Sequence, residues 1–219
     1  MTETYEIARK NMVINQLRPN KINEEKLLKI FEDIPKEDYL NKDLLDNCYV
    51  DMNLNITSNR GYLKNLHLAQ ILKYSNVKLS DKVLHIGGLT GYFSVLLSRI
   101  CYKVIAIEEN NKLFDTLKTN IEKNSIDNVT LINNKLLDGF ESDAPYDLII
   151  IDGPIFELNS QLKKQLSNNG GRLVYIKKIN NELSKAYKIV KNKDLYSSEY
   201  LFDVMCNFEI QKKEEVFIF

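Results

Sequence analysis

The sequence has few of the residues that build metal sites or disulfide scaffolds. Its three cysteines, Cys48, Cys101 and Cys206, lie far apart and form no Cys-x-x-Cys pair. Histidine occurs only at His67 and His85. An odd, dispersed set of thiols excludes a disulfide framework and a thiolate metal site, and two histidines exclude a His-rich site. We therefore expect no bound metal.

Long apolar runs and an excess of one charge are also missing. No apolar run reaches the roughly 18 residues of a membrane-spanning helix, and the opening MTETYEIARKN has no signal core. The 30 basic and 30 acidic side chains cancel, so the overall charge gives no attraction to nucleic acid or to an anionic membrane. These absences predict a cytoplasmic protein with neither kind of partner.

What is present is a globular composition, with 44% hydrophobic and 10% aromatic residues. In the first part of the chain the apolar residues recur at helical spacing. Helices are expected up to Leu17, over Asn23 to Asp33 and over Leu63 to Tyr74. The polar stretch 41–61 between the last two is expected to be a loop with a short strand.

From Asp81 onward, short apolar segments alternate with helical ones, which is typical of a parallel sheet covered by helices on both faces. The expected strands are 83–87, 103–108, 129–133, 147–152, 171–176, 196–206 and 214–219, the last two as an antiparallel edge pair. Helices are expected over 92–101, 112–124 and 156–166, and the lysines of 177–193 suggest the solvated side of another. The pattern predicts an α/β fold, a doubly wound and mostly parallel sheet over 76–219, preceded by a helical extension over 1–75.

Ligands of doubly wound sheets lie beyond the carboxyl ends of the strands. The first strand here runs into the turn Gly87-Gly88-Leu89-Thr90-Gly91, whose glycines allow a sharp bend and a close approach to a ligand. The second strand ends at Glu108, whose carboxylate can accept hydrogen bonds from both hydroxyls of a ribose. Together these features favour a nucleoside-containing cofactor. The alternative is that the turn serves only tight packing and the acid is merely solvated.

The glycine spacing argues against two other classes of ligand. G-G-x-x-G differs from the G-x-G-x-x-G of dinucleotide-binding proteins, and no G-x-x-x-x-G-K-[ST] for a nucleoside triphosphate occurs.

The segments VLHIGGLTGY, VIAIEEN, NVTLINN, APYDLIIIDG and GGRLVYI, in this order, resemble the protein-L-isoaspartate O-methyltransferase family. Upstream, ARKNMVINQLRPN, IPKEDYL and NCYVDMNLNI resemble the helical opening of such enzymes. The resemblance implies a seven-stranded methyltransferase sheet and S-adenosylmethionine as cofactor. It also implies methyl transfer to the α-carboxyl of isoaspartyl residues in damaged proteins, which would be the partners of this chain.

Several positions depart from the family's pattern. His85 stands where the first strand usually ends in an acid, and Leu89 replaces the middle glycine of the turn, which directs a branched side chain toward the methionine part of the cofactor. Lys135 stands where the family offers an acid to the adenine. Asp152 ends the fourth strand, where a smaller residue is usual.

The substrate side departs as well. The family carries a Thr-Ile-Ser stretch whose hydroxyl lies near the reacting carboxylate, and this chain has Ile56-Thr57-Ser58-Asn59-Arg60-Gly61 there. Two alignments place either Ser58 or Arg60 at the serine, so both are candidate catalytic residues. Arg60 is able to pair with a substrate carboxylate if it points into the cleft, and is otherwise a solvated loop side chain.

The resulting hypothesis is an S-adenosylmethionine-dependent protein-L-isoaspartate O-methyltransferase. Its expected cofactor-binding residues are His85, Gly87, Gly88, Leu89, Gly91, Glu108, Glu109, Lys135 and Asp152. Two alternatives stay open: a relative that has lost catalysis and acts as a binding or scaffold protein, and a methyltransferase with a different acceptor.

Overall fold

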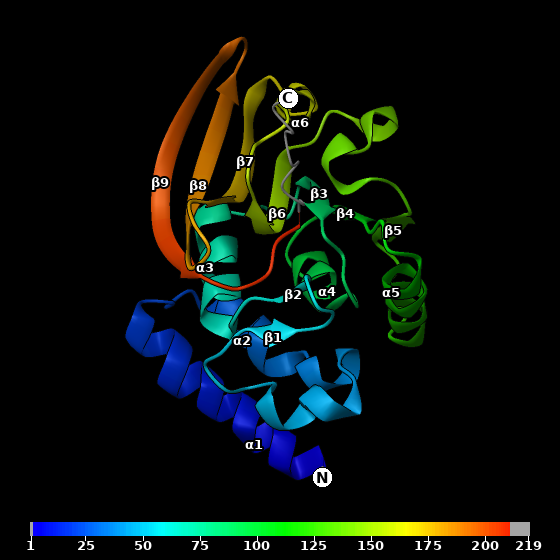
Figure 1. The fold of residues 1–219 in the computed structure, drawn as a ribbon, viewed down its shortest axis with the longest axis vertical. Coiled ribbons are helices and arrows are strands. Elements are labelled where there is room, and N and C mark those ends of the chain that lie inside the picture. The colour runs from blue at the N-terminus through cyan, green and yellow to red at the C-terminus, as the bar shows by residue number, and fades with distance from the viewer. Residues whose placement is uncertain (1, 211–219) are drawn as a thin grey trace, which may run out of the picture.

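The computed structural model describes residues 2–210, and its N-terminal part is a helical layer (Figure 1). The helices are α1 (Thr2–Met12), α2 (Glu25–Asp33) and α3 (Asn65–Ser75). Helix α1 continues through a π-helical turn, Val13–Leu17, and a short 3-10 turn, Arg18–Asn20. Two further 3-10 turns, η3 (Lys36–Tyr39) and η4 (Lys42–Asn47), lead to a small antiparallel hairpin of β1 (Leu54–Asn55) and β2 (Gly61–Tyr62).

The rest of the chain forms one seven-stranded sheet in the order β5-β4-β3-β6-β7-β8-β9. Its strands are β3 (Lys82–Ile86), β4 (Lys103–Ile107), β5 (Val129–Ile132), β6 (Leu148–Ile155), β7 (Asn169–Lys178), β8 (Leu183–Asn192) and β9 (Leu195–Met205). The first five are parallel, and β8 and β9 run antiparallel to their neighbours. The intervening helices are α4 (Tyr92–Ser98), α5 (Asn111–Lys123) and α6 (Ser160–Lys164).

Alternate residues of the central strands belong to two different apolar clusters, as the two-residue period of a strand requires. On one face Val83, Val104 and Ile150 join the N-terminal helices, α3, α4 and α5 in the larger cluster. On the other face Leu84 and Ile105 pack in a smaller cluster that includes α6. The sheet is therefore covered on both faces, which confirms the predicted doubly wound α/β fold.

The C-terminal half differs most from the sequence prediction at residues 183–192. The lysine-rich segment expected to be helical is strand β8, which pairs with both β7 and β9. Its buried positions Ser184 and Ala186 alternate with half-buried Lys185 and Tyr187, because lysine stems can cover apolar surface while the amine stays in water. The strand expected over 196–206 is β9, but its partner is β8, and the segment 214–219 expected to pair with it lies outside the described residues.

The helix predicted over 156–166 is shorter in the structure. Strand β6 extends through Pro154 and Ile155, and α6 begins only after Asn159, whose side chain caps it by accepting the Gln161 amide. The pairing of β6 with β7 shifts register between Ile150 and Pro154, and such bulges re-aim side chains near functional sites. Strands β3 and β4 end together at Ile86 and Ile107, beside Ile151 of β6, at the point where strand order reverses. This is the position that holds ligands in open α/β sheets. Among the helices within residues 2–210, none has the length and apolarity to cross a membrane.

Candidate functional site

The turn after β3 keeps a glycine-like backbone although one of its glycines is replaced. Gly87 and Gly91 have φ values of 103° and 104°, and Leu89 between them has φ 49°. Leucine rarely adopts this left-handed conformation, yet Leu89 is only 2% exposed and belongs to the larger apolar cluster. The alternating positive φ of a G-x-G-x-G turn is therefore preserved, with burial of the leucine side chain offsetting its strain.

Glu108 follows β4 directly and is fully buried beside this turn. Its carboxylate accepts two backbone N–H groups, from Leu89 to Oε2 at 2.9 Å and from Asn110 to Oε1 at 3.0 Å. These amides fix the orientation of the carboxylate, so that its two remaining acceptor positions point away from the turn. The sequence predicted this residue as the ribose acceptor.

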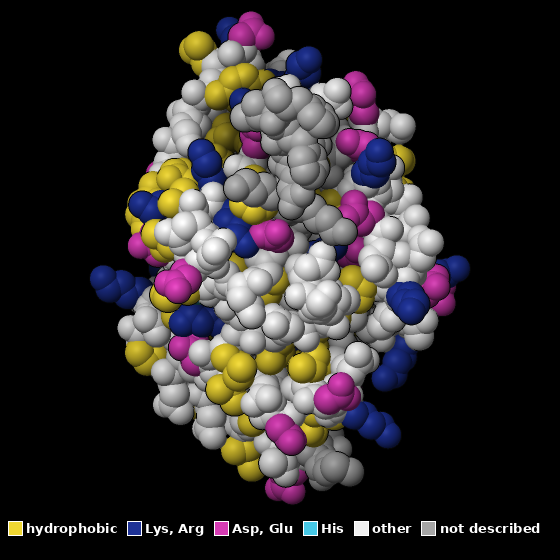
Figure 2. All heavy atoms as spheres, viewed as in Figure 1, with side chains coloured by type: hydrophobic (Ala, Val, Ile, Leu, Met, Phe, Trp, Pro, Cys, Tyr) yellow, Lys and Arg dark blue, Asp and Glu magenta, His cyan; other side chains and the backbone are white. Residues whose placement is uncertain are grey.

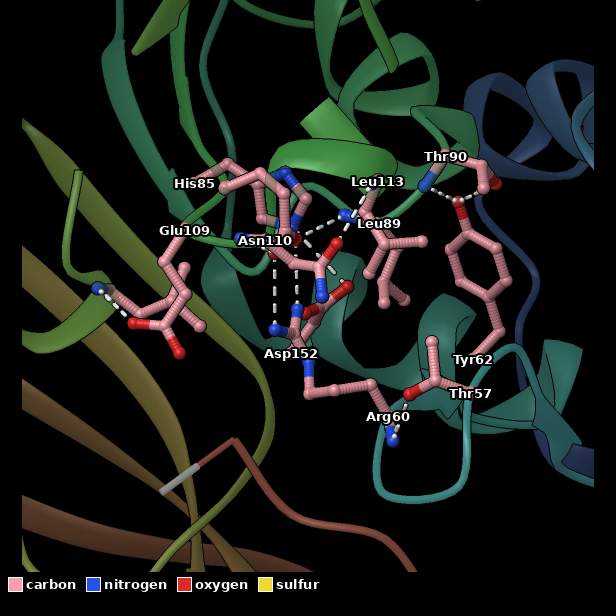
Figure 3. Close-up of polar contacts among 12 residues, drawn as sticks. Thr57, Arg60, Tyr62, His85, Leu89, Thr90, Glu109, Asn110, Leu113 and Asp152 are labelled. Atoms are coloured by element: carbon pink, nitrogen blue, oxygen red, sulfur yellow. Dashed lines mark hydrogen bonds and ion pairs between the residues drawn. The ribbon is translucent and has the colours of Figure 1, made fainter. Parts of the chain in front are cut away.

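Those two positions of Glu108 are taken by Arg60, which Figure 3 labels near Leu89 and Asn110. Its Nη1 donates to Oε1 of Glu108 at 3.3 Å, and its Nη2 donates to Oε2 at 3.0 Å. The Arg60 side chain is 8% exposed and the Glu108 side chain 0%, so the pair is a buried, bidentate ion pair rather than a surface contact. The interpretation of Arg60 as a solvated loop side chain is wrong, and Glu108 does not stand free for a ribose.

The β1–β2 hairpin places Arg60 at this point. The amides of Ile56 and Thr57 both donate to the Arg60 carbonyl, each at 2.9 Å. The next residue must be glycine, because a Cβ at Gly61 would lie 2.3 Å from the backbone oxygen of Leu54. The Arg60 backbone is thus held firmly in the hairpin, while its long side chain reaches across to the sheet.

His85 and Asp152 form a second buried polar cluster beneath the turn. The His85 Nε2 lies 3.2 Å from Oδ2 of Asp152, and its Nδ1 lies 2.8 Å from Oγ of Ser94 on α4. Asp152 lies in the bulged part of β6 and leans over Gly87, where its Oδ1 would be 3.0 Å from a Cβ on that glycine. An acid near this point of the turn is therefore retained, but it comes from β6 instead of β3.

The segment after β9 crosses the front of the sheet toward the same turn (Figure 1). The amide of Ile210 donates to the Pro154 carbonyl at 2.8 Å, and the amide of Glu209 donates to the Asn59 carbonyl at 3.1 Å. The side chain of Ile210 lies over Gly87, with Cδ1 at 3.2 Å from where a Cβ would be. This segment therefore covers part of the turn and contacts the loop that carries Arg60.

An open pocket of about 570 Å³ adjoins the Arg60–Glu108 pair. Its lining includes Arg60, Glu109, Asn110, Lys135, Asp138 and Ile210. The side chain of Glu109 accepts the Leu136 amide at 3.2 Å, which ties the end of β4 to the residues after β5. A pocket of this size, beside the ends of β4 and β5, is within the range of small-molecule and cofactor sites.

The structure brings most of the predicted site residues together. The glycine turn, Glu108 and Arg60 are in contact, His85 and Asp152 lie directly below, and Glu109 and Lys135 line the pocket beside them. Ser58 is exposed on the hairpin loop and lines a different cavity, with Asn180 and Phe208. Sequence reasoning missed Ser94 and Ile210, and no local motif marks either of them.

Comparison with known proteins identifies the family of this chain. The family model of protein-L-isoaspartate(D-aspartate) O-methyltransferase matches residues 8–206. The chain belongs to this family. It is 27% identical over 170 residues to the protein-L-isoaspartate O-methyltransferase of Koribacter versatilis, covering 78% of this chain and 76% of that one. It is 28% identical over 166 residues to that of Methanoculleus marisnigri, covering 76% and 75%.

Solved structures share the fold. One protein-L-isoaspartate O-methyltransferase superposes with a TM-score of 0.80 at 22% identity, covering 91% of this chain, which spans 65% of that one. A putative protein-L-isoaspartate O-methyltransferase from Plasmodium falciparum, solved in complex with S-adenosyl-L-homocysteine, gives 0.78 at 21% identity, with 94% and 99% covered. The seven-stranded methyltransferase fold is therefore shown for this chain.

The described residues fit the nucleoside part of the family's cofactor, S-adenosylmethionine. The turn has the required backbone, Glu108 is fixed by two amides beside it, and an open pocket lies next to both. Arg60 must leave Glu108 before two hydroxyls can bind there, because a carboxylate has about four acceptor positions and all are in use. A side-chain rotation meets this condition, since the Arg60 backbone stays in its hairpin.

Proposed function

We propose that this chain is an S-adenosylmethionine-dependent methyltransferase that methylates the carboxyl group of isoaspartyl residues in damaged proteins. The observation that carries the proposal is Glu108, held in place by the amides of Leu89 and Asn110 at the end of β4. The family membership of residues 8–206 and the positive φ values of Gly87, Leu89 and Gly91 in the turn support it. We also expect the protein to act in the cytoplasm, where its buried, unpaired cysteines remain reduced.

The cofactor, when bound, supplies a sulfonium methyl group that an ionised carboxylate can attack without acid or base catalysis. The residues of the chain therefore bind and orient. Glu108 would accept the ribose hydroxyls and the Gly87–Gly91 turn would lie against the cofactor, while Glu109 and Lys135 line the adjoining pocket. Positioning and exclusion of water are the main sources of rate in such a site.

The carboxylate of Asp152 lies next to the glycine turn and pairs with the imidazole of His85. Asp152 is 4% exposed and its Oδ2 lies 3.2 Å from Nε2 of His85, whose Nδ1 contacts Ser94. We propose that Asp152 takes the place of the acid that is absent from the end of β3, and that His85 positions it. His85 is thus a supporting residue and not a base.

A non-catalytic relative would share the fold and lack cofactor binding. A measurement of cofactor binding therefore distinguishes it from the proposed enzyme. Glu108→Ala should weaken S-adenosylhomocysteine binding at least about tenfold, because a hydrogen bond to a charged group contributes about 1.5–3 kcal/mol. Calorimetry with purified wild type, Glu108→Ala and, as control, Glu122→Ala, an exposed acid on α5, makes the measurement. Equal affinities in wild type and Glu108→Ala would place the cofactor elsewhere.

A further inference from the structure

The two hydroxyl-binding positions of Glu108 are filled by a side chain of the same protein. Each carboxylate oxygen accepts one backbone amide and one guanidinium N–H, with Arg60 on the outer side at 3.0 Å and 3.3 Å. A guanidinium presents two parallel donors, as two neighbouring ribose hydroxyls do. Arg60 and a nucleoside therefore compete for the same acceptors.

Arg60 is able to move without unfolding its surroundings. Its backbone is fixed at the base of the β1–β2 hairpin, and the loop residues before it, Ser58 and Asn59, are exposed. The pocket of about 570 Å³ is lined by Arg60 itself, so there is room beside the guanidinium. Glu108 keeps two amide donors when Arg60 leaves.

The displaced guanidinium needs a new partner. On leaving Glu108 the guanidinium gives up a buried, bidentate ion pair, so a nucleoside alone would displace Arg60 at a net cost. A carboxylate that arrives at the same site removes this cost by pairing with Arg60 in place of Glu108. Nucleoside binding and carboxylate binding are thereby coupled through one side chain.

We infer that Arg60 is a carboxylate-binding residue that Glu108 holds until a nucleoside occupies the site, an inference that rests on the proposed function. Two carboxylates of the reaction have the required chemistry: that of the cofactor's methionine part and that of the isoaspartyl substrate. In either case Arg60 changes partner, from Glu108 to the incoming carboxylate, as the site fills. Its role is binding and orientation.

Adenosine, which has no carboxylate, isolates the first half of the exchange. Arg60→Ala should bind adenosine about tenfold more tightly than wild type, because the competing donor is gone. Truncating a side chain in a binding site ordinarily weakens binding, so an increase in adenosine affinity would be specific to the loss of a competing donor. Arg172→Ala is the matched control, since it breaks another buried Arg–acid pair, with Asp81, near the amino ends of the strands. It should leave adenosine affinity unchanged.

The second half of the exchange is tested with a carboxylate present. If the cofactor supplies it, S-adenosylhomocysteine should exceed adenosine in affinity by a larger factor in wild type than in Arg60→Ala. If the substrate supplies it, an isoaspartyl peptide should tighten adenosine binding to wild type and not to Arg60→Ala. Arg60→Gln, which keeps a neutral donor, should change affinities in the same directions by smaller factors, and it serves if the alanine variant does not fold.

The outcomes separate this inference from the proposed function. Measurable adenosine binding that is equal or weaker in a folded Arg60→Ala contradicts the exchange and leaves the cofactor site intact. Absence of adenosine and S-adenosylhomocysteine binding in wild type and in both Arg60 variants overturns the proposed function, and the exchange with it.

Discussion

Leu89 has a backbone conformation that costs a leucine about 1–2 kcal/mol relative to the usual regions. Burial of the Leu89 side chain in the larger apolar cluster offsets this conformational cost. The resemblance to the family predicts that the Leu89 side chain extends toward the cofactor. In the structure this leucine contributes to the core that joins the turn to the N-terminal helices, so its replacement should affect stability first.

Substitutions at Leu89 should follow an unusual order. Leu89→Ala loses the buried side chain and keeps the left-handed strain, whereas Leu89→Gly loses the side chain and relieves the strain. Both should be less stable than wild type, with glycine about 1 kcal/mol more stable than alanine. Chemical denaturation of the three proteins measures this order. An alanine variant more stable than the glycine variant would show that the turn does not hold residue 89 at positive φ.

At the scale of elements, the short turn η3 contacts α3, the β1–β2 hairpin and α4 through Lys36. This lysine is fully buried, donates to Oδ1 of Asn65 at 2.8 Å, and lies 5.6 Å and 5.5 Å from the ring centres of Tyr62 and Tyr92. No carboxylate within residues 2–210 is paired with it in an ion pair. Burial lowers the pKa of Lys36 to about 7.

This shift predicts how stability depends on pH. Between about pH 7 and 10.5 the unfolded chain holds a proton on Lys36 that the folded protein has released, so stability rises with pH by up to about 1.4 kcal/mol per unit. Below pH 7 the lysine is protonated in both states and contributes no slope. Lys36→Met, which keeps the volume and removes the titration, should lose this rise. Measuring the free energy of unfolding of wild type and Lys36→Met at pH 6, 7.5 and 9 tests this prediction. The same pH dependence in both proteins would contradict it.

How far the elements follow from the sequence depends on how they are stabilised. The buried parallel strands β3 and β4 are apolar runs, and the sequence predicts them to within one residue at each end. For β6 the sequence predicts the start equally well but misses the extension to Ile155. Strand β8 was mistaken for a helix because it is half-buried and lysine-rich, and only its pairing with β7 and β9 makes it a strand. Local pattern identifies elements that are buried on both faces better than those at an antiparallel edge.

At the scale of the whole molecule, the site is assembled from segments that are distant in the chain. Glu108 and the glycine turn belong to one βαβ unit, so their proximity was predictable from spacing. Arg60 lies 48 residues before Glu108, and only the β1–β2 hairpin, docked on the sheet, brings the two together. Ile210 reaches the same point from the far edge through β9. No spacing rule covers such contacts, which explains why the pairing of Glu108 was not predicted.

The protein carries no excess of charge of either sign that would attract a strongly charged partner. On the face drawn in Figure 2, lysine and arginine side chains are interspersed with acidic ones rather than gathered in one patch. This matches the equal numbers of basic and acidic residues. Recognition of the substrate should therefore depend on the carboxylate and its local backbone more than on long-range charge.

The central claim is methyl transfer to an isoaspartyl carboxylate, and one measurement tests it directly. Purified wild-type protein is incubated with S-adenosylmethionine carrying a labelled methyl group and either an isoaspartyl peptide or the same peptide with ordinary aspartate. We predict labelling of the isoaspartyl peptide alone, reduced at least about tenfold by Glu108→Ala at subsaturating cofactor. No labelling of the isoaspartyl peptide at saturating cofactor, or equal labelling of both peptides, would contradict the account.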